Sequence, residues 1–179
     1  MMKMADGGFR PAYNVQLATD TGTQLIVGVE VDNLGSDRGH LTPMLEQLES
    51  RYERLPEEML VDAGFASHQA IDIAHERAVT LYTPVVKPRD RTRDPYQPRP
   101  GDSEAVAQWR LRMGSEEAKR LYLHRAATAE CVNALARQRG LQQFAVRGRR
   151  KVRAVALWYA LAHNLMRALS LPKLAVAPA

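Results

Sequence analysis

The chain has 179 residues, of which 45% are hydrophobic and 25% are charged. This composition is typical of one globular domain and excludes a disordered or fibrous protein. No run of about 18 apolar residues occurs, which excludes a transmembrane helix, and the N-terminus lacks the apolar core of a signal peptide. The single cysteine, Cys131, excludes a disulfide framework and a cysteine-rich zinc site. We therefore expect a cytoplasmic protein.

The net charge of +5 is distributed unevenly along the chain. All 20 acidic residues lie in positions 1–130 with 16 lysines and arginines, so that part carries a charge of −4. The last 49 residues contain no acid and nine lysines or arginines, a charge of +9. Such asymmetry favours a polyanion partner, most simply nucleic acid. The alternative is an ordinary solvated basic helix end.

Periodicity and capping signals in the first half predict the order β-β-α-β-α-β. The elements are strands at 13–19 and 24–31, a helix at 40–54, a strand at 59–62, a helix at 67–77 and a strand at 79–85. Asp20, Thr21 and Gly22 are turn residues, so the first two strands should form an antiparallel hairpin. Ser67 is the expected cap of the second helix.

The second half is predicted to be mostly helical. Four prolines and five lysines or arginines make 87–102 a surface loop, because such a segment cannot build a core. Helical sequence follows at 103–139, with a break at Gly114 and a new start capped by Ser115. We expect an extended segment at 142–146, a basic loop at 147–153 and a final amphipathic helix at 154–169.

Two acids are candidates for chemistry. Asp62 ends a predicted buried strand, where a charge is costly unless it is paired or functional, although it could simply cap a turn. Glu130 is the last acid of the chain, and Arg137 follows it by two helical turns at only about 20° around the helix, so a surface ion pair is the alternative. If the two carboxylates meet, their oxygens suit Mg²⁺ or Mn²⁺ rather than zinc. A third carboxylate is normally needed to complete a two-metal site.

Other reactive residues carry weaker signals. The five histidines have no metal-ligand spacing, and no phosphate-binding loop or nucleophile elbow is present. Cys131 has no neighbouring base, so we predict a buried structural thiol.

Several motifs occur together in an informative order. They are YNVQ at 13–16, SDRGHL at 36–41, VDAGF at 61–65, YLHR at 122–125 followed by Glu130 and Arg137, and AHNL at 162–165. Together they resemble an insertion-sequence transposase with a DDE catalytic domain. The group around Glu130 is similar to the tyrosine–arginine–glutamate–lysine signature at the third catalytic acid of that family.

The resemblance implies a ribonuclease-H-like α/β fold, in which a five-stranded mixed sheet is flanked by helices and three acids hold two metal ions. Asp62 corresponds to the second catalytic aspartate and Glu130 to the third acid. Tyr122, Arg125 and Arg137 are expected to support Glu130 or to contact DNA phosphates. The basic residues Arg147, Arg149, Arg150 and Lys151 are expected to contact DNA without sequence preference.

The sequence departs from the family pattern in three ways. Arg125 precedes Glu130 by five residues instead of four, which on a regular helix puts it about 140° away. Arg137 replaces the usual lysine. The first catalytic aspartate of the family lies on a strand upstream of the Tyr13 strand, but residues 1–12 do not predict a strand and Asp6 is a poor substitute.

The third departure has consequences for the fold. We expect 1–179 to be a single, incomplete catalytic domain lacking the first, central strand, with the basic segment 137–179 at its end. Exposed sheet edges should then make the chain marginally stable, self-associating or dependent on the missing N-terminal part.

The function implied is DNA transposition by metal-dependent phosphodiester hydrolysis and strand transfer. The expected partners are the element ends and target DNA, without a membrane, at a cytoplasmic, nucleoid-associated location. The alternative is a catalytically inactive nucleic-acid-binding remnant with the same fold.

Overall fold

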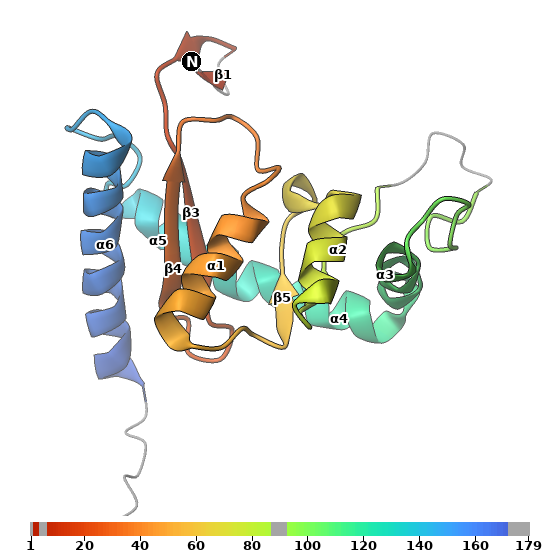
Figure 1. Ribbon diagram of the computed structural model, residues 1–179. Coiled ribbons are helices and arrows are strands. Elements are labelled where there is room, and N and C mark those ends of the chain that lie inside the picture. Colours follow the sequence, from red (N-terminus) through yellow and green to blue (C-terminus); the bar gives the residue numbers. More distant parts are fainter. Residues whose placement is uncertain (1, 4–6, 87–92, 172–179) are drawn as a thin grey trace, which may run out of the picture.

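The computed structural model describes residues 2–3, 7–86 and 93–171 of a mixed α/β fold (Figure 1). Its strands are β1 (Met2–Lys3), β2 (Phe9–Arg10), β3 (Asn14–Thr19), β4 (Ile26–Asp32), β5 (Glu58–Leu60) and β6 (Thr80–Tyr82). Its α-helices are α1 (Leu41–Tyr52), α2 (His68–Glu76), α3 (Glu104–Gly114), α4 (Glu116–Arg125), α5 (Cys131–Gln138) and α6 (Arg149–Ser170). A short 3₁₀ turn, Ala63–Phe65, follows β5, and a π-helix, Ala126–Glu130, joins α4 to α5.

The strands pair in three separate two-stranded sheets. The predicted hairpin is confirmed, since β3 and β4 are antiparallel with Val15 opposite Val31. Strands β5 and β6 are parallel, with Met59 opposite Leu81. The expected single mixed sheet is not formed, because within the described residues no strand joins β3–β4 to β5–β6. The expectation that residues 1–12 contain no strand is wrong, because β1 and β2 form a two-residue antiparallel pair.

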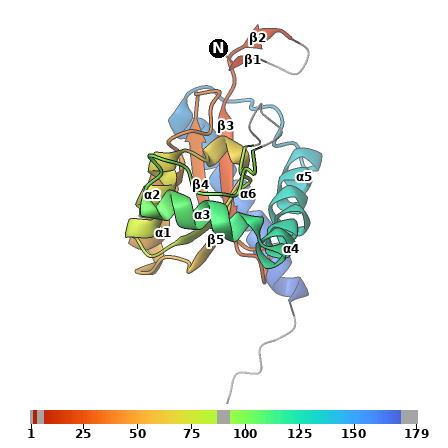
Figure 2. The same ribbon diagram turned by 90° about the vertical axis from the view of Figure 1, so that its right-hand side faces the viewer.

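Helices cover the strands from both sides. Figure 2 shows α1 and α2 on one side of β3, β4 and β5, with α4 and α5 on the other. One core cluster lies among α1, α2, α3 and the β5–β6 pair and includes Leu45, Leu81 and Val106. A second cluster joins the hairpin to α5 and α6 through Val31, Val132 and other buried residues. Helix α1 contacts both β4 and α2 and so connects the two halves.

Side chains satisfy backbone groups along β4. The Gln47 amide accepts from Val29 N (2.8 Å) and donates to Val29 O (3.0 Å), as a neighbouring strand would. The Asn164 amide does the same for Ile26, with both bonds at 2.8 Å. Arg51 donates to the Val27 carbonyl at 2.8 Å. These contacts block strand addition at β4.

The predicted break in the long helical region is confirmed. Ser115 Oγ accepts from Ala118 N at 3.1 Å and begins α4, as expected for an N-cap. Ser67 caps α2 in the same way, with Ala70 N at 3.1 Å. These caps are local signals, which explains why the sequence identifies them.

Three predictions for the C-terminal half are wrong. Residues 142–146 form a turn and bends rather than an extended segment, and the predicted basic loop at 147–153 is helical from Arg149 onward. Gly148 adopts φ 91°, which glycine tolerates without strain, and α6 begins at the next residue, with Val152 fully buried in its first turns. Cys131 is exposed, because α5 turns Val132 and Ala136 inward instead.

The surface loop predicted at 87–102 is described in its second part. Residues 93–102 form turns and bends without a helix or strand, as expected, and residues 87–92 lie outside the described residues.

Candidate active site

Asp62 lies two residues after the end of β5, where hydrogen bonds fix its backbone. The Val61 carbonyl accepts from the Tyr122 hydroxyl (3.2 Å), and the Asp62 carbonyl accepts from Thr83 Oγ1 (3.2 Å). Asp62 Oδ1 accepts from Ala63 N at 2.6 Å and caps the 3₁₀ turn. Asp62 Oδ2 does not take part in this cap and can contact other groups. Asp62 can therefore both cap the turn and serve as a site residue.

The π-helix at Ala126–Glu130 corrects the expectation for Arg125. Arg125 Nη1 lies 3.0 Å from Glu130 Oε1, although a regular helix would place these residues on different faces. A π-helix bonds residue i to i+5 and therefore brings residues five apart onto one face. Polar groups accompany the irregular turn, since Thr128 Oγ1 donates to the His124 carbonyl (2.9 Å) and Gln24 Nε2 to the Ala127 carbonyl (3.2 Å). The π-helix therefore allows Arg125 to contact Glu130 although they are five residues apart instead of four.

Arg125 joins the two candidate acids. Its Nη2 lies 3.2 Å from Asp62 Oδ2, so one guanidinium contacts both Asp62 and Glu130. The Arg125 side chain is 19% exposed, whereas the two carboxylates are 55% and 59% exposed. The structure therefore brings the acids together on an accessible surface with their shared cation partly buried between them.

Tyr122 and Arg137 differ in their relation to Glu130. The Tyr122 hydroxyl contacts the segment that carries Asp62, and burial raises the pKa of this phenol. Tyr122 also lies close enough to Arg125, Asp62 and Glu130 for their charges to affect the pKa of its phenol. In the part of the chain that the structure describes, no ion pair joins Glu130 to Arg137. Two helical turns separate this pair by about 10 Å along the axis, whereas Arg125 is one turn away. Support for Glu130 thus comes from Arg125.

The basic residues predicted to contact DNA cluster where α6 begins. Arg147 lies in the preceding turn, and Arg149, Arg150 and Lys151 form the first turn of the helix, all with exposed side chains. Two acids lie near the cluster: Asp32 is 3.9 Å from Arg149, a long contact for an ion pair, and Glu30 lines a pocket together with Arg149 and Arg150. The cations of the cluster outnumber these acids.

Asp37 is a site residue that stood out in the sequence only as part of a motif. Its Oδ1 accepts from Asn14 Nδ2 (2.7 Å) and Gln16 Nε2 (3.3 Å), both on β3. Its Oδ2 lies against Gly64, where an added Cβ would be only 2.9 Å away. Asp37 therefore links the hairpin to the turn that follows Asp62, a long-range contact that only the VDAGF and SDRGHL motifs could have suggested.

We expect Gly64→Ala to lower the free energy of unfolding by about 1–3 kcal/mol, because the new methyl group collides with a carboxylate held by two amides. Chemical denaturation measures the change. Gly22→Ala is the matched control, since its Cβ would meet its nearest neighbour at 3.6 Å. In an Asp37→Ala background the cost of Gly64→Ala should shrink. An equal cost in both backgrounds would show that the collision is not with Asp37.

The carboxylate oxygens at this site are suitable ligands for a divalent metal, but two side chains are too few to complete a metal site. Asp62 and Glu130 supply carboxylate oxygens, which Mg²⁺ and Mn²⁺ prefer. Within residues 2–3, 7–86 and 93–171, no group of three or more histidine, cysteine, aspartate or glutamate side chains is arranged to hold a metal ion. Asp6, considered as the upstream acid, lies outside the described residues. The described ligand set is therefore partial.

Comparison with known protein families gives a match in the second part of the chain. A family model described as a transposase DDE domain matches residues 88–169. This segment contains Arg125, Glu130 and the basic start of α6, while Asp62 precedes it. The resemblance to an insertion-sequence transposase DDE domain is thus confirmed over residues 88–169. No curated protein and no solved structure matches the chain.

The helices differ from membrane-spanning segments in length or in polarity. Among the described residues, none is both long enough and apolar enough to cross a bilayer.

Proposed function

We propose that this chain acts in DNA transposition as a metal-dependent nuclease and strand transferase, with Asp62 and Glu130 as metal ligands. One observation carries the proposal: carboxylates from two distant elements converge on the Arg125 guanidinium within reach of solvent. Carboxylate oxygens gathered in one place are the ligands that Mg²⁺ and Mn²⁺ prefer. The family match over 88–169 supplies the reaction class.

The order of elements supports a ribonuclease-H-like arrangement. An antiparallel hairpin precedes a parallel pair, and helices flank both, as in strands two to five of that fold. A further strand between β3 and β5 would unite the two pairs in one sheet. Such a strand is also where the family carries its first catalytic aspartate, so it would complete the ligand set around Asp62 and Glu130.

Each residue of the site then has a defined task. A bound divalent ion supplies Lewis-acid stabilisation of the phosphodiester and activation of the attacking oxygen. Asp62 and Glu130 would hold the ion, while Tyr122 and Thr83 fix the backbone around Asp62. Arg125 keeps the two carboxylates together before metal and DNA bind, and its planar guanidinium suits a DNA phosphate afterward.

The start of α6 is the proposed phosphate-binding surface. Arg149, Arg150 and Lys151 occupy the positive end of the helix dipole, where cations destabilise a helix. Phosphate groups would relieve this unfavourable charge and would also accept hydrogen bonds from the first backbone N–H groups. Arg147, exposed just before α6, adds to this positive charge, and Arg137 on α5 is a further exposed cation.

We expect Arg149→Ala combined with Arg150→Ala to reduce the salt dependence of DNA binding. Each phosphate contact contributes roughly 0.9 to the slope of log affinity against log salt, so the double variant should lower the slope by about two. Fluorescence anisotropy with a labelled duplex over a series of KCl concentrations measures it. Arg54→Ala removes an exposed arginine elsewhere and should leave the slope unchanged. An unchanged slope in the double variant would remove this surface from the DNA interface.

The function itself is tested with plasmid DNA that carries the coding region and its genomic flanks. The proposal predicts nicking that requires Mg²⁺ or Mn²⁺ and stops when EDTA is added. DNA binding without metal-dependent cleavage would instead establish the alternative, an inactive nucleic-acid-binding remnant. Absence of both cleavage and binding would contradict both functions.

A further inference from the structure

Helix α6 turns its smaller side chains inward and its larger ones outward. Its buried residues are Val152, Ala156, Ala160 and His163. Its outward side chains, called here the outer stripe, are Trp158, Leu161, Leu165 and Leu169, which are 71%, 49%, 59% and 89% exposed. A helix that contacts only its own domain would be expected to show the opposite distribution.

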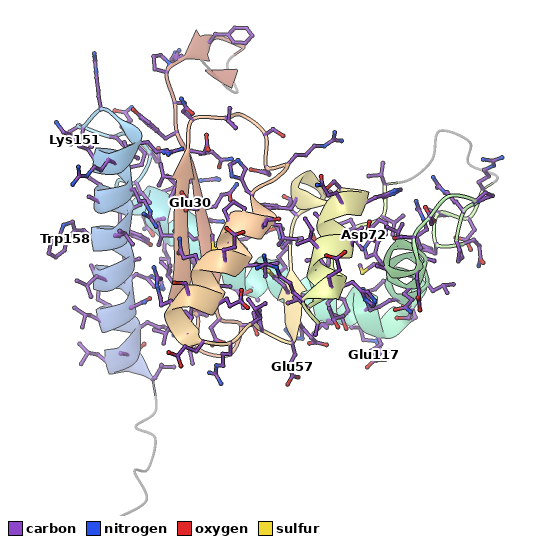
Figure 3. The ribbon with its side chains drawn as sticks, viewed as in Figure 1. Glu30, Glu57, Asp72, Glu117, Lys151 and Trp158 are labelled. Atoms are coloured by element: carbon purple, nitrogen blue, oxygen red, sulfur yellow. The ribbon has the colours of Figure 1, made fainter. Side chains whose placement is uncertain are left out.

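The outer stripe is continuous and lies opposite the buried face. At 100° per residue, its four members fall within an arc of about 80°. Figure 3 shows Trp158 pointing away from the rest of the molecule. Single exposed apolar residues are common on monomers, but a contiguous stripe of this size marks an interaction surface.

We propose that the outer stripe is an interface with a second copy of this chain, formed by two antiparallel α6 helices about a two-fold axis. The four side chains offer on the order of 500 Å² of apolar surface per copy, so the pair would bury about 1,000 Å². That value is near the minimum for a specific protein interface.

Side-chain sizes make the stripe complementary to itself. With the two-fold axis at the level of residue 163, Leu161 faces Leu165 of the second copy, and the large Trp158 faces the small Ala168. Such mutual pairing is characteristic of an isologous interface, in which the same surface serves on both subunits.

The charges of α6 require the antiparallel arrangement. The helix carries Arg149, Arg150, Lys151 and Arg153 at its start and no acidic residue anywhere. Its one further cation, Arg167 in the last turn, donates to the Thr23 carbonyl and so faces the hairpin. A parallel pair would place the cations at the start of each helix side by side. An antiparallel pair separates the two clusters by about 30 Å, several Debye lengths at physiological salt. It also leaves both clusters uncovered by the partner helix.

The same charges disfavour a lipid surface as the occupant. Helices that lie on membranes carry cations along the polar face beside the apolar stripe. In α6 the cations are concentrated in the first turns, and the face opposite the stripe is buried against the β3–β4 hairpin.

Sedimentation velocity of the full chain tests the proposal. The wild type should be a dimer, and Leu161→Glu combined with Leu165→Glu should weaken association about a hundredfold or more, because two charges per copy would be buried without partners. Leu111→Glu, which changes a 53% exposed leucine on α3, is the matched control and should remain dimeric. Thermal melts establish that each variant is folded.

Tryptophan fluorescence gives an independent measurement. Trp109 is buried and donates to the Thr83 carbonyl, so its emission should be constant. Trp158 should be protected from acrylamide in the wild type and quenched in the double variant. A wild-type monomer overturns the proposal, whether Trp158 is quenched or is covered by the chain's own residues. A dimer that persists in the double variant overturns it as well.

Discussion

Replacing Asp62 with asparagine, or Glu130 with glutamine, is expected to reduce Mg²⁺-dependent DNA cleavage by more than about 100-fold. Each substitution keeps the shape of the side chain but removes the negative charge that would hold the metal ion. Metal stabilisation of a reacting phosphodiester contributes several kcal/mol, and each 1.36 kcal/mol is a factor of ten in rate. Plasmid nicking under single-turnover conditions measures the loss.

Two controls separate catalysis from folding. Glu117→Gln changes an exposed carboxylate on α4 and should cleave at the wild-type rate. DNA binding by the Asp62 and Glu130 variants should persist, because the proposed phosphate contacts lie at the start of α6. Wild-type activity in either variant, or an equal loss in Glu117→Gln, would disprove the assignment. Titration with Mn²⁺ gives a readout independent of turnover, since both variants should bind the ion more weakly.

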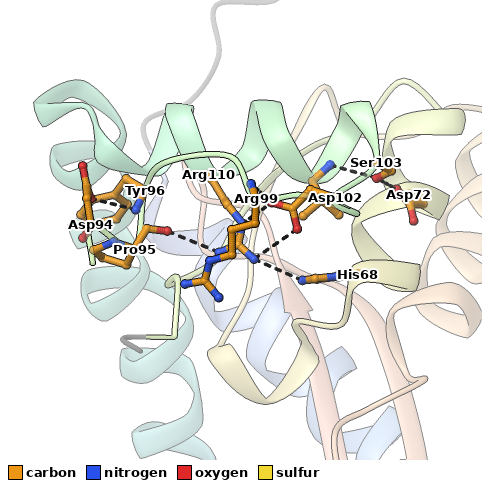
Figure 4. A network of polar contacts seen from close by, with 10 residues as sticks. His68, Asp72, Asp94, Pro95, Tyr96, Arg99, Asp102, Ser103 and Arg110 are labelled. Atoms are coloured by element: carbon orange, nitrogen blue, oxygen red, sulfur yellow. Dashed lines mark hydrogen bonds and ion pairs between the residues drawn. The ribbon is translucent and has the colours of Figure 1, made fainter. Parts of the chain in front are cut away.

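Replacing Asp102 with alanine is expected to lower the free energy of unfolding by about 3 kcal/mol, the cost of leaving a buried partner charge unpaired. Asp102 Oδ2 lies 2.7 Å from Arg110 Nε, and both side chains are only 5% exposed. Arg110 also donates to the Pro95 carbonyl (3.3 Å) and lies 3.5 Å from His68 Nε2 (Figure 4). The Asp102–Arg110 pair and the other contacts of Arg110 therefore hold residues 93–102 against α2 and α3.

Thermal unfolding provides the measurement. A loss of this size lowers the midpoint by on the order of 10 °C for a chain of this length. Glu116→Ala is the matched control, because it also breaks an ion pair, with Lys119 at 2.8 Å, but at an exposed position where such pairs contribute little. If the two variants melt at the same temperature, the Asp102–Arg110 pair does not stabilise the fold in the way we infer.

The lowered pKa of Asp102 leads to a prediction of how the stability of the fold depends on pH. Hydrogen bonding from Arg110 is the main cause that lowers the pKa of Asp102, and the Arg99 backbone N–H adds to it. A lowered native pKa stabilises the fold fully above the unfolded value of about 3.9, and this stabilisation is lost as pH falls through the native pKa. Below about pH 4 the melting temperature of Asp102→Asn should therefore fall less steeply than that of the wild type. Parallel curves would contradict this.

Local signals in the sequence were sufficient for most helices and strands. Ser67 and Ser115 cap helices through bonds to residues three positions on, and the alternation in 13–19 and 24–31 reflects the two faces of one hairpin. These features depend on contacts between residues that are close in the sequence, and for this reason the sequence alone predicts them. The order of the motifs along the chain likewise indicated the transposase family, because it requires no knowledge of tertiary contacts.

The geometry of the site depended on longer-range packing. Regular helical angles placed Arg125 away from Glu130, but the π-helix, whose Ala127 carbonyl binds Gln24 on the hairpin, brings them together. The contact of Asp37 with Gly64 likewise could not be predicted from the positions of these residues in the sequence.

The sequence by itself indicated the order β3-β4-α1-β5-α2-β6, the helix caps at Ser67 and Ser115, and the two candidate acids. The tertiary structure alone decided that Arg125 joins those acids, that Arg149 begins a helix and that the strands form separate pairs. Helical periodicity and capping act within a few residues, whereas a π-turn, the start of α6 and strand pairing depend on groups brought together from distant parts of the chain.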